Sequence, residues 1–149
     1  MTELLFYHLE RRTLEQVLPQ LLEKTLERGW RAVVQASSPE RVEALTTHLW
    51  TYKDGGFLPH GSAADGNEDL QPVYLTESDD NPNGAQIRFF VDGADGNEFK
   101  GYERVVFMFD GNHHDALETA RARWKAVKAA GLEATYWQQN DAGGWEKKA

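Results

Sequence analysis

Residues 4–9 read LLFYHL, a short run in which almost every side chain is large and apolar. Two more runs of this kind are AVVQA at 32–36 and VVFMF at 105–109. A strand with one solvated face alternates apolar and polar side chains, whereas a strand covered on both faces is apolar almost throughout. The three runs therefore predict buried, parallel β-strands.

The segment after the first run has the spacing of an amphipathic helix. Leucine and valine recur three or four positions apart from Leu14 onward, and Thr13 with Gln16 has the spacing of a capping box. Gly29 is a suitable C-terminal stop, and we expect Pro19 to kink this helix.

Two further helices follow the second and third runs. Ser38 and Pro39 suit a cap and a first helical residue, and Asn112 is expected to cap a helix that ends at Gly131. Strands that alternate with helices predict an α/β fold: an open, mostly parallel sheet with helices on both faces and right-handed crossovers. Shorter strands are expected at residues 73–75, 87–91 and 134–137.

The length of 149 residues and the hydrophobic content of 40% suit one domain with a single core. We expect this domain to span residues 1–140, followed by a flexible C-terminal tail at residues 141–149. The chain has no cysteine, which excludes disulfides and thiolate chemistry. It has no apolar run long enough for a bilayer and no signal-peptide pattern, so we expect it in the cytoplasm.

The net charge of −8 comes from one stretch of the chain. Residues 65–103 hold ten acidic and two basic side chains, and the remaining residues are balanced. This charge opposes the binding of nucleic acid phosphates or anionic lipid, so we expect no direct nucleic acid or membrane partner. Because the acids are concentrated in one segment, they need not repel ligands elsewhere on the surface.

A nucleotide-binding loop is missing from the sequence. A parallel sheet binds phosphates through a glycine-rich turn that enters a helix, yet the chain has no G-x-G-x-x-G. The nearest P-loop candidate, GNEFKG at 96–101, continues with Tyr102 and Glu103 where Lys and Ser or Thr are required. We therefore expect no cofactor; the alternative is an α/β enzyme that binds a nucleotide or small ligand without a recognisable motif.

Two polar clusters have simple structural explanations. DDNPNG at 79–84 matches the first half of a calcium loop, but the twelfth position is Phe90 instead of Glu, which favours an ordinary turn. His113 and His114 are adjacent and so point about 100° apart on a helix, which favours helix capping over a metal site. We assign no metal ligand and no catalytic residue.

The third helix carries the clearest candidate for a binding site. Arg121, Lys125 and Lys128 fall along one border of its buried stripe, with Trp124 beside them, and no acidic residue occurs at 119–132. One interpretation is a solvated helix face. The other is a site for an acidic, partly apolar peptide, in which the cations hold carboxylates and the indole packs against an apolar side chain.

A second candidate follows the second helix, where large apolar side chains surround a turn. Such residues can close the bottom of the core, or their exposed part can form a protein–protein patch. They are Trp50, Tyr52, Phe57, Leu58, Pro59 and His60.

Several segments, taken in order, resemble one protein family. They are Phe6-Tyr7 in the first strand, Trp50 followed by FLPH at 57–60, and ARARWKA at 120–126 leading to AAG at 129–131. With this order and spacing the chain resembles the chi subunit of bacterial DNA polymerase III, a non-catalytic component of the clamp-loader assembly. The resemblance implies a Rossmann-like fold without nucleotide chemistry.

The resemblance also implies an adaptor with two protein-binding surfaces and no reaction of its own. One surface would bind the psi subunit or a helicase-like protein through Trp50 and Phe57. The other would hold the acidic carboxyl-terminal tail of single-stranded DNA-binding protein (SSB), and the matching positions are Arg121, Trp124, Lys125 and Lys128.

Overall fold

The structure is a computed structural model of the chain and describes residues 2–52, 58–94, 99, 101–142 and 144–149. The elements are β1 (Glu3–Leu9), α1 (Leu14–Glu27), β2 (Ala32–Gln35), α2 (Pro39–Thr51), β3 (Gly61–Ser62), β4 (Val73–Thr76), β5 (Ile87–Phe90), β6 (Arg104–Asp110), α3 (His114–Ala129), β7 (Glu133–Gln139) and β8 (Trp145–Lys147). Two short 3-10 helices, η1 (Ala63–Asp65) and η2 (Glu68–Leu70), lie between β3 and β4. The predicted α/β class is confirmed. None of the described helices combines the length and apolar character needed to cross a membrane.

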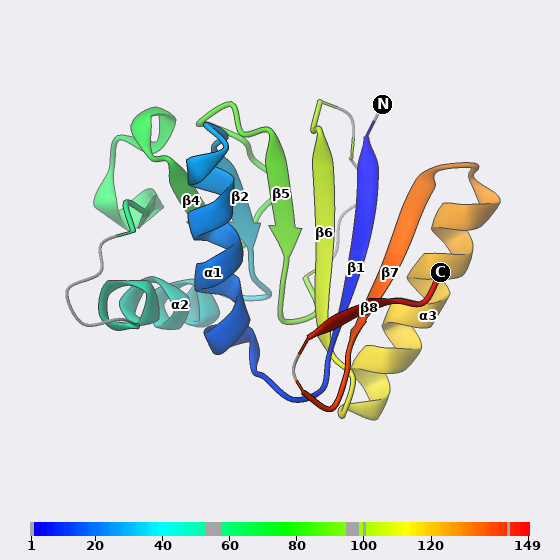
Figure 1. Cartoon of the computed structure of the whole chain (residues 1–149). Coiled ribbons are helices and arrows are strands. Elements are labelled where there is room, and N and C mark those ends of the chain that lie inside the picture. Colours follow the sequence, from blue (N-terminus) through cyan, green and yellow to red (C-terminus); the bar gives the residue numbers. More distant parts are fainter. Residues whose placement is uncertain (1, 53–57, 95–98, 100, 143) are drawn as a thin grey trace.

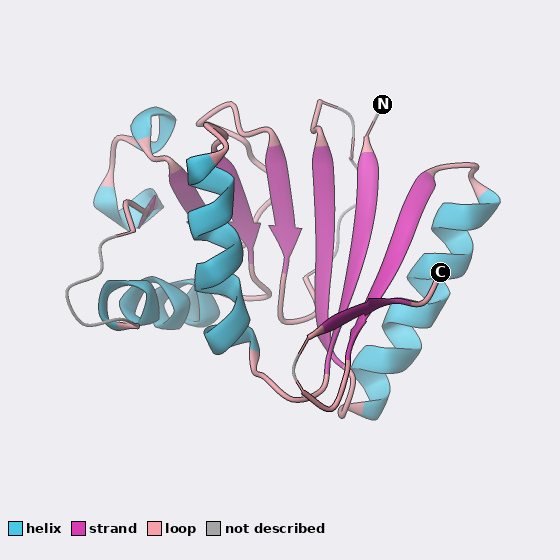
Figure 2. Ribbon diagram, viewed as in Figure 1, coloured by secondary structure: helices cyan, strands magenta, loops and turns pink. Residues whose placement is uncertain are grey.

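The strands form one open sheet in the order β3-β4-β2-β5-β6-β1-β7-β8. All neighbouring strands are parallel except β7 and β8, which are antiparallel. Figure 1 shows α1 and α2 at the β2–β5 side of the sheet and α3 at the β7 side, and Figure 2 shows the strands as one layer. Because α1 leads from β1 in one direction and α3 leads from β6 in the other, the winding reverses between β6 and β1.

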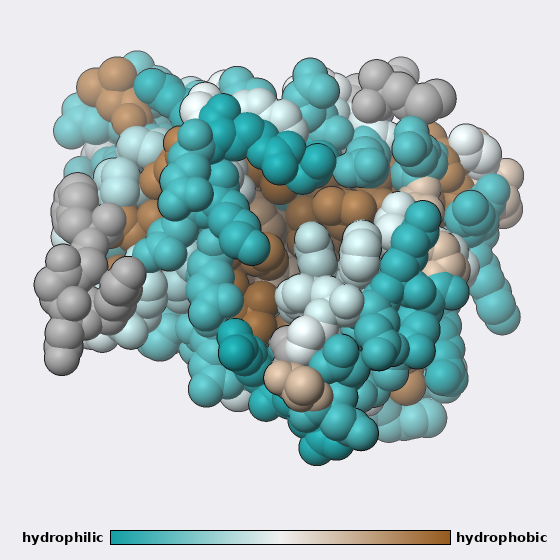
Figure 3. All heavy atoms as spheres, viewed as in Figure 1, coloured by the Kyte–Doolittle hydropathy of each residue, from teal (hydrophilic) through white to brown (hydrophobic). Residues whose placement is uncertain are grey.

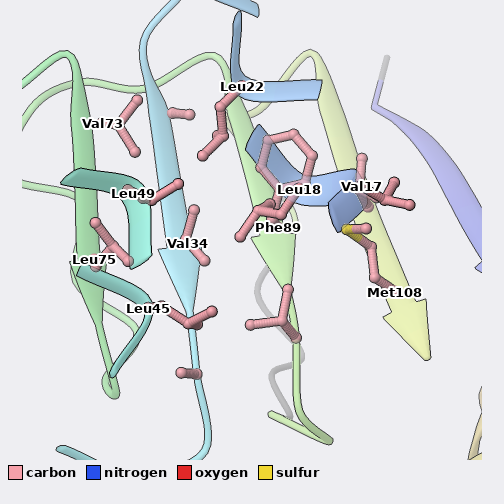
Figure 4. Close-up of a cluster of buried hydrophobic side chains, with 14 of the residues drawn as sticks. Val17, Leu18, Leu22, Val34, Leu45, Leu49, Val73, Leu75, Phe89 and Met108 are labelled. Atoms are coloured by element: carbon pink, nitrogen blue, oxygen red, sulfur yellow. The ribbon is translucent and has the colours of Figure 1, made fainter. Parts of the chain in front are cut away.

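Alternate residues of the strands enter two cores on opposite faces of the sheet. In β1, Leu5 and Leu9 pack with residues of α1 and α2, whereas Leu4 and Phe6 pack with residues of α3. The face of the sheet on which α1 packs is open between α1 and β8. Figure 3 shows brown and pale residues there, bordered by hydrophilic ones. Figure 4 shows the core beneath α1 and α2, including Leu18, Leu49, Val34 and Phe89.

Helix α1 begins at the predicted capping box of Thr13 and Gln16 and continues through Pro19. Proline has no amide hydrogen, so the carbonyl of Glu15, four residues earlier, loses its helical donor. The Nε2 atom of His48 in α2 donates to this carbonyl oxygen at 2.6 Å. A side chain of α2 thus replaces the backbone hydrogen bond that proline removes from α1.

The predicted cap is present at α2, where the Ser38 hydroxyl accepts a hydrogen bond from the amide of the third helical residue. The cap expected at α3 is wrong by one residue. His113, not Asn112, is the N-cap, because its Nδ1 accepts from the Ala116 amide at 3.3 Å. The Asn112 side-chain amide instead donates to the Glu10 carbonyl at 2.8 Å, which connects the ends of β6 and β1.

For residues 141–149 we expected a flexible tail, and the structure has a strand within this segment. β8 pairs antiparallel with β7, and the Lys148 amide donates to the Tyr136 carbonyl at 2.8 Å. Trp145 packs edge-on against Tyr7, with the ring centroids 4.9 Å apart. A three-residue strand with a single large apolar side chain has no periodicity that a sequence can reveal.

The loop between β4 and β5 is held against the sheet by a buried cation. Arg88 of β5 is 1% exposed, and its guanidinium donates to the carbonyls of Ser78 and Asp80 at 2.5 and 2.8 Å. It also donates to the amide oxygen of Gln35 and to the hydroxyl of Tyr102. Neutral oxygen dipoles therefore replace the water that this charge loses on burial.

The Arg88→Met variant is expected to lower the free energy of unfolding by about 3 kcal/mol, because it leaves several buried oxygens without donors. Urea denaturation measures this loss. Arg12→Met is the matched control, since the Arg12 side chain is exposed, and it should change stability by less than about 0.5 kcal/mol. Equal effects of the two variants would contradict a structural role for Arg88.

Candidate functional site

Four candidate residues lie together on one flank of α3. Ala120 and Val127 of this helix are buried against the sheet. On the neighbouring flank the three predicted cations are exposed and the tryptophan is half-buried. We call this set the α3 strip; its members are Arg121, Trp124, Lys125 and Lys128.

Trp124 forms an aromatic corner with two residues of the sheet. Its indole meets Phe6 edge-on with a centroid distance of 5.3 Å and Tyr136 edge-on at 5.7 Å. Contacts of this geometry fix the ring while leaving part of it open to solvent. Tyr136 was not predicted as a site residue, and its one sequence signal is its place in the strand expected at 134–137.

The cations of the α3 strip differ in their surroundings. Lys128 Nζ lies 5.5 Å from the centre of the Trp124 ring, within the range of a cation–π contact. Arg121 lies 3.8 Å from the carboxylate of Glu118, just before the acid-free stretch 119–132, so its charge is partly compensated. This ion pair is long and solvent-exposed, which makes it weak. Lys125 makes no ion pair with any described residue.

The ring of Tyr136 is held from behind by a buried histidine. The Tyr136 hydroxyl lies 2.7 Å from His8 Nδ1. Burial lowers the pKa of His8. The charge of Glu10 opposes this lowering and the charge of Arg121 adds to it, so the imidazole is neutral at pH 7. Burial raises the pKa of Tyr136, and the Arg121 guanidinium opposes this rise. The charge of Arg121 therefore acts directly on the groups that form the aromatic corner.

The second candidate patch divides between core and surface. Trp50, near the end of α2, is 55% exposed, and its ring lies 4.6 Å from the ring of His60. His60 and Leu58 are buried, as in the core-closing interpretation, and His60 Nε2 lies 3.0 Å from the Thr46 carbonyl oxygen. Phe57 lies outside the described residues. The prediction that Trp50 is partly on the surface is confirmed.

The two candidate surfaces lie at different ends of the sheet. α2, which carries Trp50, lies beside β4 and β2, whereas α3 packs against β6 and β7 (Figure 1). Four strands separate β4 from β7 across the order of the sheet: β2, β5, β6 and β1. The two candidate surfaces therefore do not overlap.

A crevice of about 680 Å³ lies at the carboxyl ends of β1, β5 and β6, where the winding reverses. This is where the alternative function, a nucleotide or small-ligand site, would be located. Several charged groups of the crevice bind one another: Arg41 lies 2.9 Å from the Glu15 carboxylate and 2.8 Å from that of Asp92. Arg123 stacks over the Phe107 ring at 4.4 Å. The crevice thus has the position of a ligand site, while much of its charge is already engaged.

The calcium-like sequence 79–84 forms a turn whose polar side chains serve the fold. Asn81 accepts from the Ala85 amide at 2.9 Å, and the buried Asn83 amide donates to the carbonyls of Ala32 and Gln71. Within the described part of the chain, no three His, Asp or Glu side chains are grouped as metal ligands would be.

Comparisons with known proteins agree with the resemblance that the sequence suggested. The family model described as DNA polymerase III chi subunit, HolC, matches residues 1–135, which include the α3 strip. The probable DNA polymerase III subunit chi of Rickettsia prowazekii (strain Madrid E) is 27% identical over 117 residues, covering 74% of this chain and 71% of that protein. The chain therefore belongs to the family of DNA polymerase III chi subunits, which are accessory proteins of DNA replication.

Proposed function

We propose that this chain is a non-catalytic, cytoplasmic adaptor of the DNA polymerase III clamp-loader assembly. In this proposal the α3 strip binds the acidic carboxyl-terminal tail of SSB. Trp50 and Phe57 bind the psi subunit or a helicase-like protein, so that the chain connects the two partners.

The observation that supports tail binding most directly is the group of cations around the aromatic corner. A peptide that ends in an aromatic residue can place its ring against Trp124 and its terminal carboxylate beside Arg121. Lys125 and Lys128 can then attract acidic residues earlier in the peptide. The weak Glu118 pair does not prevent this, because a ligand carboxylate can replace an exposed one at little cost.

The second partner is supported by the exposure of Trp50. An exposed indole at a helix end, supported by the buried ring of His60, has the form of an aromatic anchor for a protein interface. The separation of α2 from α3 supports an adaptor in particular, since an adaptor must hold both partners together.

A small-ligand function is the second candidate, and the crevice at the strand ends is the observation that favours it. The missing glycine-rich turn and the ion pairs of Arg41 weigh against a phosphate ligand there.

Arg121→Glu is expected to weaken binding of an acidic peptide ending in phenylalanine by about tenfold or more, because it converts attraction into repulsion. Isothermal titration calorimetry measures this change, and the wild-type affinity should fall as salt rises and when the peptide carboxylate is amidated. The Tm should move by less than about 2 °C, since Arg121 is exposed.

Glu118→Gln is the matched control for this experiment, because it removes the intrahelical partner of Arg121. It is expected to leave the peptide affinity unchanged or to raise it. If Arg121→Glu and Lys125→Glu both bind the peptide as wild type does, the α3 strip is a solvated helix face and tail binding there is wrong.

Trp50→Ala is expected to reduce recovery of psi or helicase-like protein in an affinity pull-down several-fold, while the acidic peptide still binds at full strength. Leu70→Ala is the control, since Leu70 is also a large exposed apolar residue but lies in η2. Equal recovery with wild type and Trp50→Ala would show that this indole is not an anchor.

The isolated chain is expected not to bind single-stranded DNA with sub-micromolar affinity at physiological salt, because its net charge is −8. Millimolar ATP, GTP or NAD should leave the Tm unchanged. Fluorescence anisotropy and thermal denaturation measure these two properties. A nucleotide-dependent rise in Tm that is lost in Arg123→Ala would instead support a ligand site in the crevice.

A further inference from the structure

A second groove lies on the face of the sheet opposite α3. It has a volume of about 240 Å³ and runs between α1 and β8, over β5, β6 and β1. In Figure 3 it corresponds to the brown and pale band at the centre of the view, with hydrophilic residues on both sides. We call it the α1–β8 groove. Its volume is below the roughly 300 Å³ at which small-molecule sites usually begin, and suits one large side chain.

The floor and one wall of the α1–β8 groove are apolar or aromatic. The floor is formed by strand side chains such as Leu5 and Val106, which are buried. Tyr7 and Trp145 form the wall at the β8 side, with their rings at 68° to each other, and both are half-buried. Side chains of α1 line the groove on one side, and Trp145 of the three-residue strand β8 lines it on the other.

Three cations line the groove, and no described carboxylate does. Lys24, in the last turn of α1, and Arg28, the C-cap residue of this helix, are exposed, and neither forms an ion pair with any described residue. Arg104, at the start of β6, pairs with Glu3 at 3.1 Å outside the lining. The charged residues that line the groove are therefore all cationic.

Trp30 orders two of these cations. The guanidinium carbon of Arg28 lies 4.9 Å from the centre of the Trp30 ring, and that of Arg104 lies 5.5 Å from it. Cation–π contacts hold an arginine without neutralising its charge. Arg28 is therefore positioned in advance for an anionic ligand, which reduces the entropy lost on binding, whereas Arg104 is shared with Glu3.

We propose that the α1–β8 groove binds an acidic peptide segment of a partner protein. A large apolar side chain of the segment fills the space beside Tyr7 and Trp145, and its flanking carboxylates pair with Lys24 and Arg28. The apolar space suits one large side chain of a peptide, whereas a nucleic acid would bring a phosphate with every nucleotide to a groove lined by three cations. The recognition needs no free carboxyl terminus, and this separates the groove from the α3 strip.

The test uses a hexapeptide with acetylated and amidated ends, in which two aspartates stand on each side of a Leu-Phe pair. In NMR titrations of the ¹⁵N-labelled full chain, this peptide is expected to shift the indole signals of Trp30 and Trp145. The signal of Trp124 should remain in place. Arg28→Glu is expected to raise the Kd by about tenfold, because it places a carboxylate at the rim.

Lys125→Glu is the matched control, a charge reversal on the opposite face that should leave this Kd unchanged. Failure of tail binding at the α3 strip would therefore not affect the result. The proposal is overturned if the peptide shifts Trp124 alone, or if a peptide with lysines in place of the aspartates binds equally well. It is also overturned if a thymidine oligonucleotide binds the groove more tightly than the acidic peptide.

Discussion

The α3 strip and the α1–β8 groove both depend on one constraint, which is the position of β1 between β6 and β7. This first strand pairs in parallel with two strands from the second half of the chain, and its alternating side chains enter both cores. Phe6 faces α3 and supports Trp124 of the α3 strip, whereas its neighbour Tyr7 faces the other way and forms a wall of the α1–β8 groove. Consecutive residues of one strand thus support two proposed binding surfaces on opposite faces of the sheet.

The sequence predicted those parts of the fold that local patterns determine. The continuous apolar runs identified the buried strands, and the caps of α1 and α2 followed from residues within four positions of each other. The features that it could not predict come from residues far apart in the chain. His48 can replace the donor that Pro19 lacks only because α2 lies against α1, and β8 is a strand only because the edge of β7 is available. For the same reason the sequence identified the residues of the α3 strip but not Tyr136.

Part of the acidic segment is held to the sheet by a contact that its composition does not predict. Residues 65–103 contain ten acids, and the loop between β4 and β5 belongs to this segment. Arg88 is the cation that holds this loop. Its guanidinium donates to backbone carbonyls of the loop and not to the side-chain carboxylates of the loop. The Asp80 carboxylate, for example, accepts from the hydroxyls of Thr76 and Ser78. The loop between β4 and β5 is therefore held to the sheet through its backbone carbonyls and not through its carboxylates.

A protein with this net charge attracts an acidic peptide best where some of its cations are kept from its own carboxylates. In the α3 strip the Trp124 ring contacts Lys128, and in the α1–β8 groove the Trp30 ring contacts Arg28, whereas Arg104 and Arg121 also lie beside carboxylates of the chain. A carboxylate at the same position would fix the cation equally well, but a ligand would then have to displace it. A ring fixes the cation through its quadrupole, leaves the charge in place and offers apolar surface to the same ligand. Tryptophan beside lysine or arginine thus explains how local attraction for acidic peptides can coexist with overall repulsion.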